Sequence, residues 1–269
     1  MARKVKITRK QIKQDDKFLA TMKDVTGKVV AAVSDRDFWG QYKKPLIVAG
    51  AVLLVVVIAA GTVFGLTIYQ RHSAAKLMAL ADAMNRAPVI TPEQYEQNAA
   101  MAQALGAYTD ANAKWSAVAE NYDAVATQYP DTEFGQLALF YAGNGYYELK
   151  EYQEAVTRYE KYLEKVGSDA PFAPLAQQSV GYAYEELGKL PEAEKAFLEL
   201  VKRESTTTSL LAMFDLARIY EKQEKIDEAI ATLKKVDNVQ ISLGPQVGKL
   251  KRQAENKIKW LEASRKKPS

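Results

Sequence analysis

An uncharged apolar run from Leu46 to Ile68 constrains this chain more than any other feature of its sequence. As a helix rising ~1.5 Å per residue it would span roughly 34 Å, enough to cross a hydrocarbon layer about 30 Å thick. A cleaved secretory signal has a short basic region and an apolar core of about 7–15 residues, whereas here 45 residues precede the run. No face of the segment is polar, which disfavours a buried soluble helix. We therefore expect a retained transmembrane helix over residues 46–69.

The charges that flank this run predict its orientation. Residues 1–45 carry 12 Lys and Arg against 5 Asp and Glu, a net charge of +7, while the rest of the chain carries 25 against 28, a net charge of −3. Lys43 and Lys44 abut the run, and few basic residues follow it closely. Because basic flanks stay in the cytoplasm, we expect residues 70–269 to lie outside. In a bacterium this describes a single-pass inner-membrane protein with a cytoplasmic N-terminus and a periplasmic C-terminal domain.

Two features of the N-terminal part each leave two interpretations open. Residues 7–33 combine an apolar face and a lysine-rich face at helical spacing. They could form a helix that lies on anionic lipid or on a membrane partner, or a partly disordered basic arm that only sets the topology. Gly61 and Gly65 have the G-x-x-x-G spacing that lets two membrane helices approach closely. Because Gly is common in membrane helices, the same spacing could also arise by chance.

The segment after the apolar run reads as a juxtamembrane helix and a linker over residues 70–91, with the linker at about residues 82–91. Pro88 and Pro92 interrupt the helical composition there. Thr91 is followed by a proline at the first helical position and by Gln94 at capping-box spacing. This pattern predicts that a new helix begins at residue 92.

From there the sequence repeats itself. The segments "AGNGYYELKEYQEAVTRYEKYL", "VGYAYEELGKLPEAEKAFLEL" and "LARIYEKQEKIDEAIATLKKV" align when Ala155, Ala193 and Ala229 are superposed, at spacings of 38 and 36 residues. Three further sets then coincide: Gly143, Gly181 and Ala217; Tyr146, Tyr184 and Tyr220; and Tyr159, Phe197 and Leu233. The pattern resembles the tetratricopeptide repeat, a helix-turn-helix unit of ~34 residues.

This resemblance implies an all-α fold, in which the single transmembrane helix is followed by an α-solenoid of tetratricopeptide-like helix pairs and a C-terminal capping helix. The repeat domain should cover residues 92–269. Within it we expect a degenerate unit at 92–133, whose weak first helix lies near "MAQALGAY", repeats at about 136–168, 174–206 and 210–243, and a capping helix at 245–263. The loops "GSDAPFAP" and "RESTTTS" are longer than the family norm.

The resemblance also implies a protein-binding groove lined by the first helix of each repeat. Carried over to this sequence, its positions include Phe140, Asn144, Tyr147, Gln178, Tyr182, Glu185, Phe214 and Arg218. Family members that capture a peptide C-terminus use several cationic and amide side chains, of which only Asn144 and Arg218 are present here. An extended or helical segment with apolar side chains is therefore the better expectation. The alternative is that the aromatic residues are core, since aromatic stripes at helical spacing are often buried.

The sequence offers no catalytic constellation. It contains one histidine, no cysteine, no phosphate-binding glycine loop and no paired-histidine spacing. We therefore expect no enzyme activity, no metal or other cofactor and no small-molecule substrate. Because the excess positive charge is confined to residues 1–45, we also expect no nucleic-acid partner. The layout resembles bacterial single-span inner-membrane repeat proteins of the ancillary Sec-translocon subunit type. That implies an adaptor whose partners are membrane lipid, translocon subunits or periplasmic chaperones. The alternative is a structural scaffold for cell-wall or outer-membrane assembly proteins.

Overall fold

The computed structural model describes residues 20–31, 36–203, 207–238 and 245–265, and these residues are almost entirely helical. Residues 20–31 form one helix, and the rest of the predicted amphipathic arm, residues 7–19 and 32–33, lies outside the described residues. The helices that follow are α2 (Arg36–Arg86), α3 (Pro92–Gln97), α4 (Ala99–Ala104), α5 (Ala111–Gln128), α6 (Glu133–Glu148), α7 (Tyr152–Val166), α8 (Ala173–Glu186), α9 (Leu190–Val201), α10 (Thr207–Lys222), α11 (Ile226–Lys234), a 3₁₀ turn (Lys235–Asn238) and α12 (Pro245–Arg265). The chain divides into two compact units, residues 1–67 and 68–269.

The first unit contains the apolar part of α2. Tyr42–Arg86 is long and apolar enough to cross a membrane, and the side chains of its apolar stretch are exposed. A β-carbon added at Gly61 or Gly65 would meet nothing within 4 Å among the described residues. Neither glycine therefore packs against another described part of the chain, and the predicted helix–helix contact remains a prediction.

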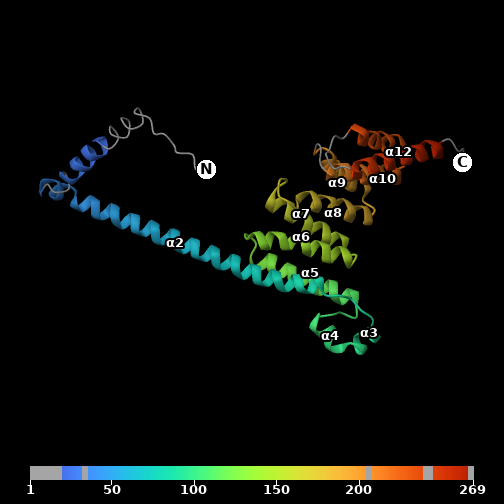
Figure 1. The fold of residues 1–269 in the computed structure, drawn as a ribbon, viewed down its shortest axis with the longest axis horizontal. Helices are drawn as coiled ribbons and strands as arrows, with labels where there is room; N and C mark the ends of the chain where they lie inside the picture. Colours follow the sequence, from blue (N-terminus) through green and yellow to red (C-terminus); the bar gives the residue numbers. More distant parts are fainter. Residues whose placement is uncertain (1–19, 32–35, 204–206, 239–244, 266–269) are drawn as a thin grey trace, which may run out of the picture. The chain divides into compact units, whose positions relative to one another are not determined.

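In the second unit, helices α5 to α11 stack in chain order, each against the next (Figure 1). The described residues contain no strand, only an isolated bridge between Val89 and Tyr108. The all-α class and the solenoid of repeated helix pairs are thus confirmed. The pairs are α6–α7, α8–α9 and α10–α11. Helix α12 covers the last pair through buried Ala254 and Leu261, as a solenoid end requires.

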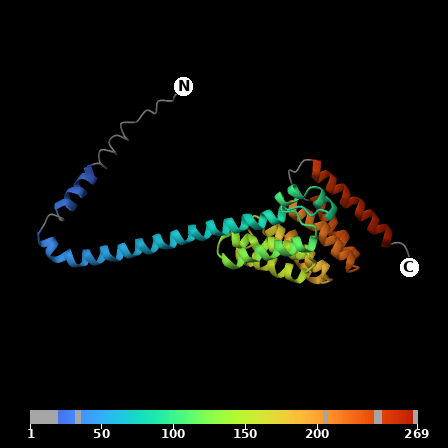
Figure 2. The ribbon, with the colours of Figure 1, turned by 90° about the horizontal axis from the view of Figure 1, so that it is seen from below.

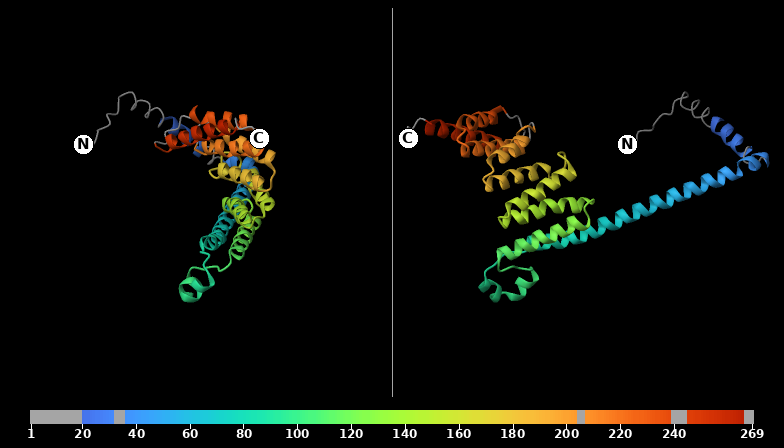
Figure 3. Two further views of the ribbon diagram at one scale, coloured as in Figure 1. Left: turned by 90° about the vertical axis from the view of Figure 1, so that its right-hand side faces the viewer. Right: turned by 180° about the vertical axis from the view of Figure 1, so that it is seen from behind.

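The C-terminal end of α2 belongs to the solenoid, which corrects our sequence-based boundary. Instead of giving way to a linker at about residue 82, the helix continues to Arg86 and runs alongside α5 (Figures 2 and 3). Ala74, Met78 and Ala81 are buried there, in or beside the core. The Tyr122 hydroxyl of α5 donates a hydrogen bond to Asp82, with 2.6 Å between the oxygens. The end of α2 therefore takes the place that we expected a helix near residues 101–108 to fill.

Between α2 and α5 the chain forms a small excursion of two short helices. Helix α3 begins as its sequence predicted: the Thr91 side chain accepts a hydrogen bond from the Gln94 backbone, and the Gln94 side chain accepts one from the Thr91 backbone. The uncharged helix α4 follows directly. Because both helices have only six residues, neither is long enough to pair with α5 along its length.

The repeat register is visible in the backbone at the turn within each pair. Lys150, Gly188 and Glu224 lie in the left-handed region, with φ of 63°, 71° and 62°. They are separated by 38 and 36 residues, the spacings found in the sequence alignment. The left-handed conformation favours glycine, which has no β-carbon. Helices commonly end at a residue in this conformation. Three turns with one geometry thus define the repeat independently of side-chain similarity.

A close helix crossing in the α6–α7 and α8–α9 pairs explains why a glycine and an aromatic residue recur at the same spacing in these two repeats. A β-carbon on Gly143 would lie 2.5 Å from Cε1 of Tyr159, and one on Gly181 would lie 2.6 Å from Cζ of Phe197. Tyr159 and Phe197 are themselves buried. Each aromatic ring of the second helix therefore occupies space that only a glycine in the first helix leaves open.

We expect Ala193→Leu to lower the free energy of unfolding by about 1–3 kcal/mol, because extra methylene groups must overpack a filled core. Ala193 is fully buried between α8, α9 and α10. Denaturant unfolding of the full-length protein in mild detergent measures the change. The matched control is Ala231→Leu on the exposed face of α11, which should change the stability by less than about 0.5 kcal/mol. Equal stabilities of the two variants would mean that Ala193 is not at a helix crossing.

Candidate protein-binding site

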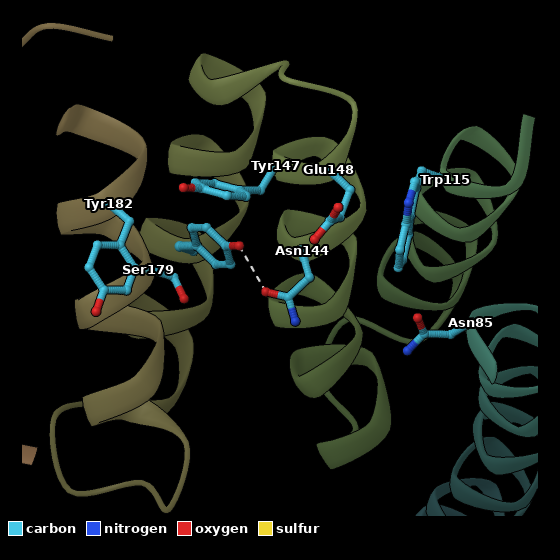
Figure 4. A pocket seen from close by; sticks show the side chains of 8 residues that line it. Asn85, Trp115, Asn144, Tyr147, Glu148, Ser179 and Tyr182 are labelled. Carbon is cyan, nitrogen blue, oxygen red and sulfur yellow. Dashed lines mark hydrogen bonds between the residues drawn. The ribbon is translucent and has the colours of Figure 1, made fainter. Parts of the chain in front are cut away.

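A cavity of about 300 Å³ opens where the first helices of the solenoid meet. Five helices contribute to its wall, because the end of α2 and all of α5 to α8 pack in sequence. Figure 4 shows the side chains facing the open space from both sides. The lining residues are Asn85, Trp115, Asn144, Tyr147, Glu148, Tyr159, Ser179 and Tyr182.

The floor of this cavity is held by a hydrogen bond between two helices. The Tyr159 hydroxyl of α7 donates to Oδ1 of Asn144 on α6, at 2.8 Å (Figure 4). Tyr159 is 2% exposed, and burial raises the pKa of its phenol. A buried phenol that stays neutral can keep donating this bond at any physiological pH. Asn144 is thereby held in one orientation, with its amide nitrogen directed away from Tyr159.

Tyr147 forms the rim of the cavity. Its ring packs edge-on against Tyr152 of α7, with ring centroids 5.2 Å apart and an interplanar angle of 66°. The side chain remains half-buried. Burial raises the pKa of Tyr147, and the nearby carboxylate of Glu186 raises it further. The ring is thus fixed at the surface in a setting of negative charge.

A polar network joins α8 to α10 next to this cavity. The Tyr182 hydroxyl lies 2.9 Å from the Gln178 amide nitrogen and 3.0 Å from an Asp215 carboxylate oxygen. The Gln178 amide also donates to Asp215, at 2.8 Å. Asp215 is 6% exposed, so these donors compensate for the removal of its carboxylate from water. Burial and the Asp215 carboxylate both raise the pKa of Tyr182.

Arg218 is held within the same network and differs from the isolated cation that the sequence suggested. Its Nε and one terminal nitrogen donate to both Glu185 oxygens, at 2.9 and 2.7 Å. Its other terminal nitrogen lies 3.1 Å from Asp215. Lys222 completes the charge balance at 2.8 Å from Glu185. The guanidinium therefore joins α10 to α8, and each of its three nitrogens already contacts a carboxylate of this chain.

Five of the eight expected groove residues lie outside this cavity. Phe140 is 3% exposed and packs within 6.0 Å, measured between ring centroids, of Tyr159, Tyr162 and Phe172. It is a core residue, because the long loop before α8 brings Phe172 over its ring. Phe214 lines a different cavity of about 350 Å³ near α12. The single groove expected from the sequence is therefore divided: Asn144, Tyr147 and Tyr182 share one cavity, Phe214 and Arg218 line another, and Gln178 and Glu185 lie in the network between them.

Five residues of the first cavity were not expected as groove residues from the sequence: Asn85, Trp115, Glu148, Tyr159 and Ser179. Asn85 and Trp115 were missed because the end of α2 and helix α5 were not recognised as a pair. A signal was present, since Ala74, Met78 and Ala81 already have the spacing of a buried helical stripe. Glu148 directly follows Tyr147, so a groove drawn only at the family positions leaves it out.

Acid should weaken the α8–α10 connection through Glu185. Burial works to raise the pKa of Glu185, but hydrogen bonds from Arg218 and Lys222 outweigh it and hold the pKa below its ordinary value. A carboxyl whose folded pKa is depressed stabilises the fold above the unfolded value of about 4.3, and that stability is lost as the pH falls through the folded value. We therefore expect the unfolding free energy to fall with acid in this range, and to fall less steeply in Glu185→Gln.

Urea unfolding at a series of pH values measures this slope. The control is Glu164→Gln, which removes the same charge from an exposed position on α7 and should leave the acid slope close to that of the wild type. Identical slopes for Glu185→Gln and the wild type would show that the ion pairs with Arg218 and Lys222 do not contribute to the folded state.

Part of the helical array is similar to a known repeat family. Residues 140–207 and 181–240 match the tetratricopeptide-repeat family model. A search of curated proteins gives no match for the chain. Similar solved structures include the nearly identical TPR-like repeats of a Podosopora anserina putative kinesin light chain, with 16% identity over 72% of this chain and 97% of that one and a TM-score of 0.43. Another is BtubC (BKLC) from P. vanneervenii, with 12% identity over 76% of this chain and 93% of that one and a TM-score of 0.41.

The residues that match the tetratricopeptide-repeat model, 140–240, include α7 to α11 and the C-terminal part of α6. Such repeats generally serve as non-catalytic surfaces for protein interaction. In this chain they are preceded by the α2–α5 pair, which supplies Asn85 and Trp115 to the cavity. The candidate site thus lies where the matched repeats meet the helices that precede them.

Proposed function

We propose that this protein is a membrane-anchored, non-catalytic adaptor whose repeat domain binds a segment of a partner polypeptide in the cavity beside Tyr147. The observation that carries the proposal is the cavity itself: half-buried aromatic rings and polar side chains from five helices converge on one opening. Rigid aromatic side chains are among the residues that contribute most to protein–protein binding. The apolar run of α2 supports anchoring, since it is long enough to span a bilayer.

The basic N-terminal arm supports a cytoplasmic N-terminus, and in a bacterium this would place the repeat domain in the periplasm. A reporter that is active only in the periplasm, fused after Ser269, should then be active. A reporter that works only in the cytoplasm should be inactive at the same position. The reverse result would overturn the proposed location.

Within this proposal, a role beside the Sec translocon follows from the resemblance of the layout to ancillary translocon subunits. The second candidate is a scaffold for cell-wall or outer-membrane assembly, which the same repeats would serve. Lipid contact through the anchor is common to both. The two differ in their partners: translocon subunits, emerging substrates and periplasmic chaperones in the first case, and envelope-assembly proteins in the second.

Site-specific photo-crosslinking tests both the site and the partner class. A photoreactive aromatic residue placed at Tyr147 should form adducts with a bound partner in living cells. The same residue at Lys161, exposed on α7 and outside the cavity, is the control. Mass spectrometry of the adducts then decides between the two partner classes. Equal labelling from both positions, or none from Tyr147, would rule out this cavity as the working surface.

A further inference from the structure

We propose that the Tyr147 side of the cavity receives a basic side chain, Lys or Arg, from the bound polypeptide. This inference rests on the proposed function and adds the chemistry of one residue of the partner. It is carried by a carboxylate and an aromatic ring that both line the cavity from α6, Glu148 and Tyr147 (Figure 4). A cation over an aromatic face is attracted by the ring quadrupole, and a carboxylate elsewhere on the wall of the same cavity adds charge complementarity.

The aromatic rings around the cavity differ in whether a cation of this chain already contacts them. The Lys114 ammonium lies 4.5 Å from the ring centroid of Trp115, and the Arg218 guanidinium lies 5.6 Å from that of Tyr182. In the described part of the chain no such cation contact is found at Tyr147, whose edge-on neighbour is Tyr152. Tyr159 also lacks such a contact among the described residues, but it is buried. The half-buried Tyr147 is therefore the ring without a cation that an incoming side chain can reach.

The carboxylates near the cavity also differ in whether a cation of this chain pairs with them. Glu185 is neutralised by Arg218 and Lys222. Glu148, one residue after Tyr147, forms no ion pair with any described Lys or Arg. Glu186 adds a second negative charge near Tyr147 and Tyr152. A ligand cation would thus meet uncompensated negative charge on this side of the cavity, whereas a ligand carboxylate would be repelled.

The size of the cavity agrees with one side chain as the occupant. Sites for whole small molecules measure about 300–1,000 Å³, and this cavity lies at the lower limit with about 300 Å³. The long aliphatic stem of Lys or Arg can lie against aromatic surface while its charged end reaches a carboxylate. The side chains of Asn85 and Asn144 also line the cavity, and their amide oxygens can accept hydrogen bonds from the charged end of Lys or Arg.

Peptide selection on the full-length protein in detergent tests this inference. A phage library displaying random nine-residue peptides is selected on the wild type, on Glu148→Gln and on the matched control Glu164→Gln. We expect Lys or Arg to be enriched at one position with the wild type and the control, and not with Glu148→Gln. In a synthetic copy of a selected peptide, norleucine in place of that basic residue should weaken wild-type binding roughly tenfold. The same replacement should have little effect on binding to Glu148→Gln.

The outcomes separate this inference from the proposed function. Selected peptides that compete with the Tyr147 cross-link but show no basic position would overturn the basic-residue inference and leave the adaptor site standing. A full preference for Lys or Arg in Glu148→Gln would likewise overturn the basic-residue inference and leave the adaptor site standing. If no peptide is enriched on the wild type, or if the enriched peptides do not compete with the cross-link, the proposed site fails and the inference fails with it. Thermal unfolding of Glu148→Gln, expected to match that of the wild type, excludes misfolding as the cause of a lost preference.

Discussion

Replacing Phe197 with alanine is expected to lower the free energy of unfolding by about 3–5 kcal/mol, the usual cost of deleting a large buried aromatic side chain. Phe197 is fully buried and lies within a cluster that joins α8, α9 and α10. For a domain of this size the loss corresponds to a drop in melting temperature on the order of 10 °C. Circular dichroism of the full-length protein in mild detergent measures the change.

The control for this substitution is Leu211→Ala, an apolar truncation on the same repeat array at a side chain that is 41% exposed. Because little buried surface is lost there, the effect should stay within about 0.5–1 kcal/mol. Similar losses for the two variants would mean that Phe197 is not a central core residue and that the α8–α9 crossing is incorrectly described.

The same crossing predicts a coupling between Gly181 and Phe197. A methyl group added at Gly181 would meet the Phe197 ring at 2.6 Å, so Gly181→Ala and Phe197→Leu should be non-additive. The smaller leucine leaves room for the new methyl group, and the double variant should be more stable than the sum of the single changes predicts. Additive effects would place the two residues apart.

The repeat array could be predicted from sequence because its rules are local and recur. Gly181 with Phe197, and Gly143 with Tyr159, mark two helix crossings, and the repeat spacing recurs in the three left-handed turns. Thr91 predicted the start of α3 for a similar reason, since a capping box involves only neighbouring residues. Sequence patterns that depend only on short-range geometry thus predicted the corresponding structural features correctly.

The site could be predicted only in part because its contacts connect different repeats. Arg218 contacts Glu185 across 33 positions of sequence, and Gln178 contacts Asp215 across 37, close to one repeat length. A family groove position gives the direction of a side chain but not the neighbour that covers it. Phe140 illustrates this, since Phe172 from an unusually long loop packs over its ring. The location of Tyr147 was predictable, whereas the pairing of Arg218 was not.

The first helix pair was the largest omission, and its physical cause is the uninterrupted length of α2. The boundary was placed before residue 92 because the two prolines indicate a break. They do mark the end of α2, but the preceding turns already contribute to the core through Met78 and its neighbours. One part of a helix can be apolar on all sides while the next part is amphipathic. The start of the repeat domain is therefore marked better by a change of periodicity within α2 than by the end of that helix.

A fragment of residues 92–269 should consequently be much less stable than one of residues 68–269. The shorter fragment lacks the buried side chains of Ala74, Met78 and Ala81 and leaves the buried Tyr122 without Asp82. Loss of a buried methionine side chain alone typically costs about 2–5 kcal/mol, and the α5 surface left uncovered would be an apolar patch prone to aggregation. Thermal unfolding and binding of a hydrophobic dye compare the two fragments. Within the longer one, Met78→Ala should reproduce part of the loss, while Leu80→Ala, at a side chain that is 51% exposed, should not. If both fragments melt at the same temperature, the end of α2 is dispensable for the core, and Asn85 cannot be held in place as part of the cavity wall.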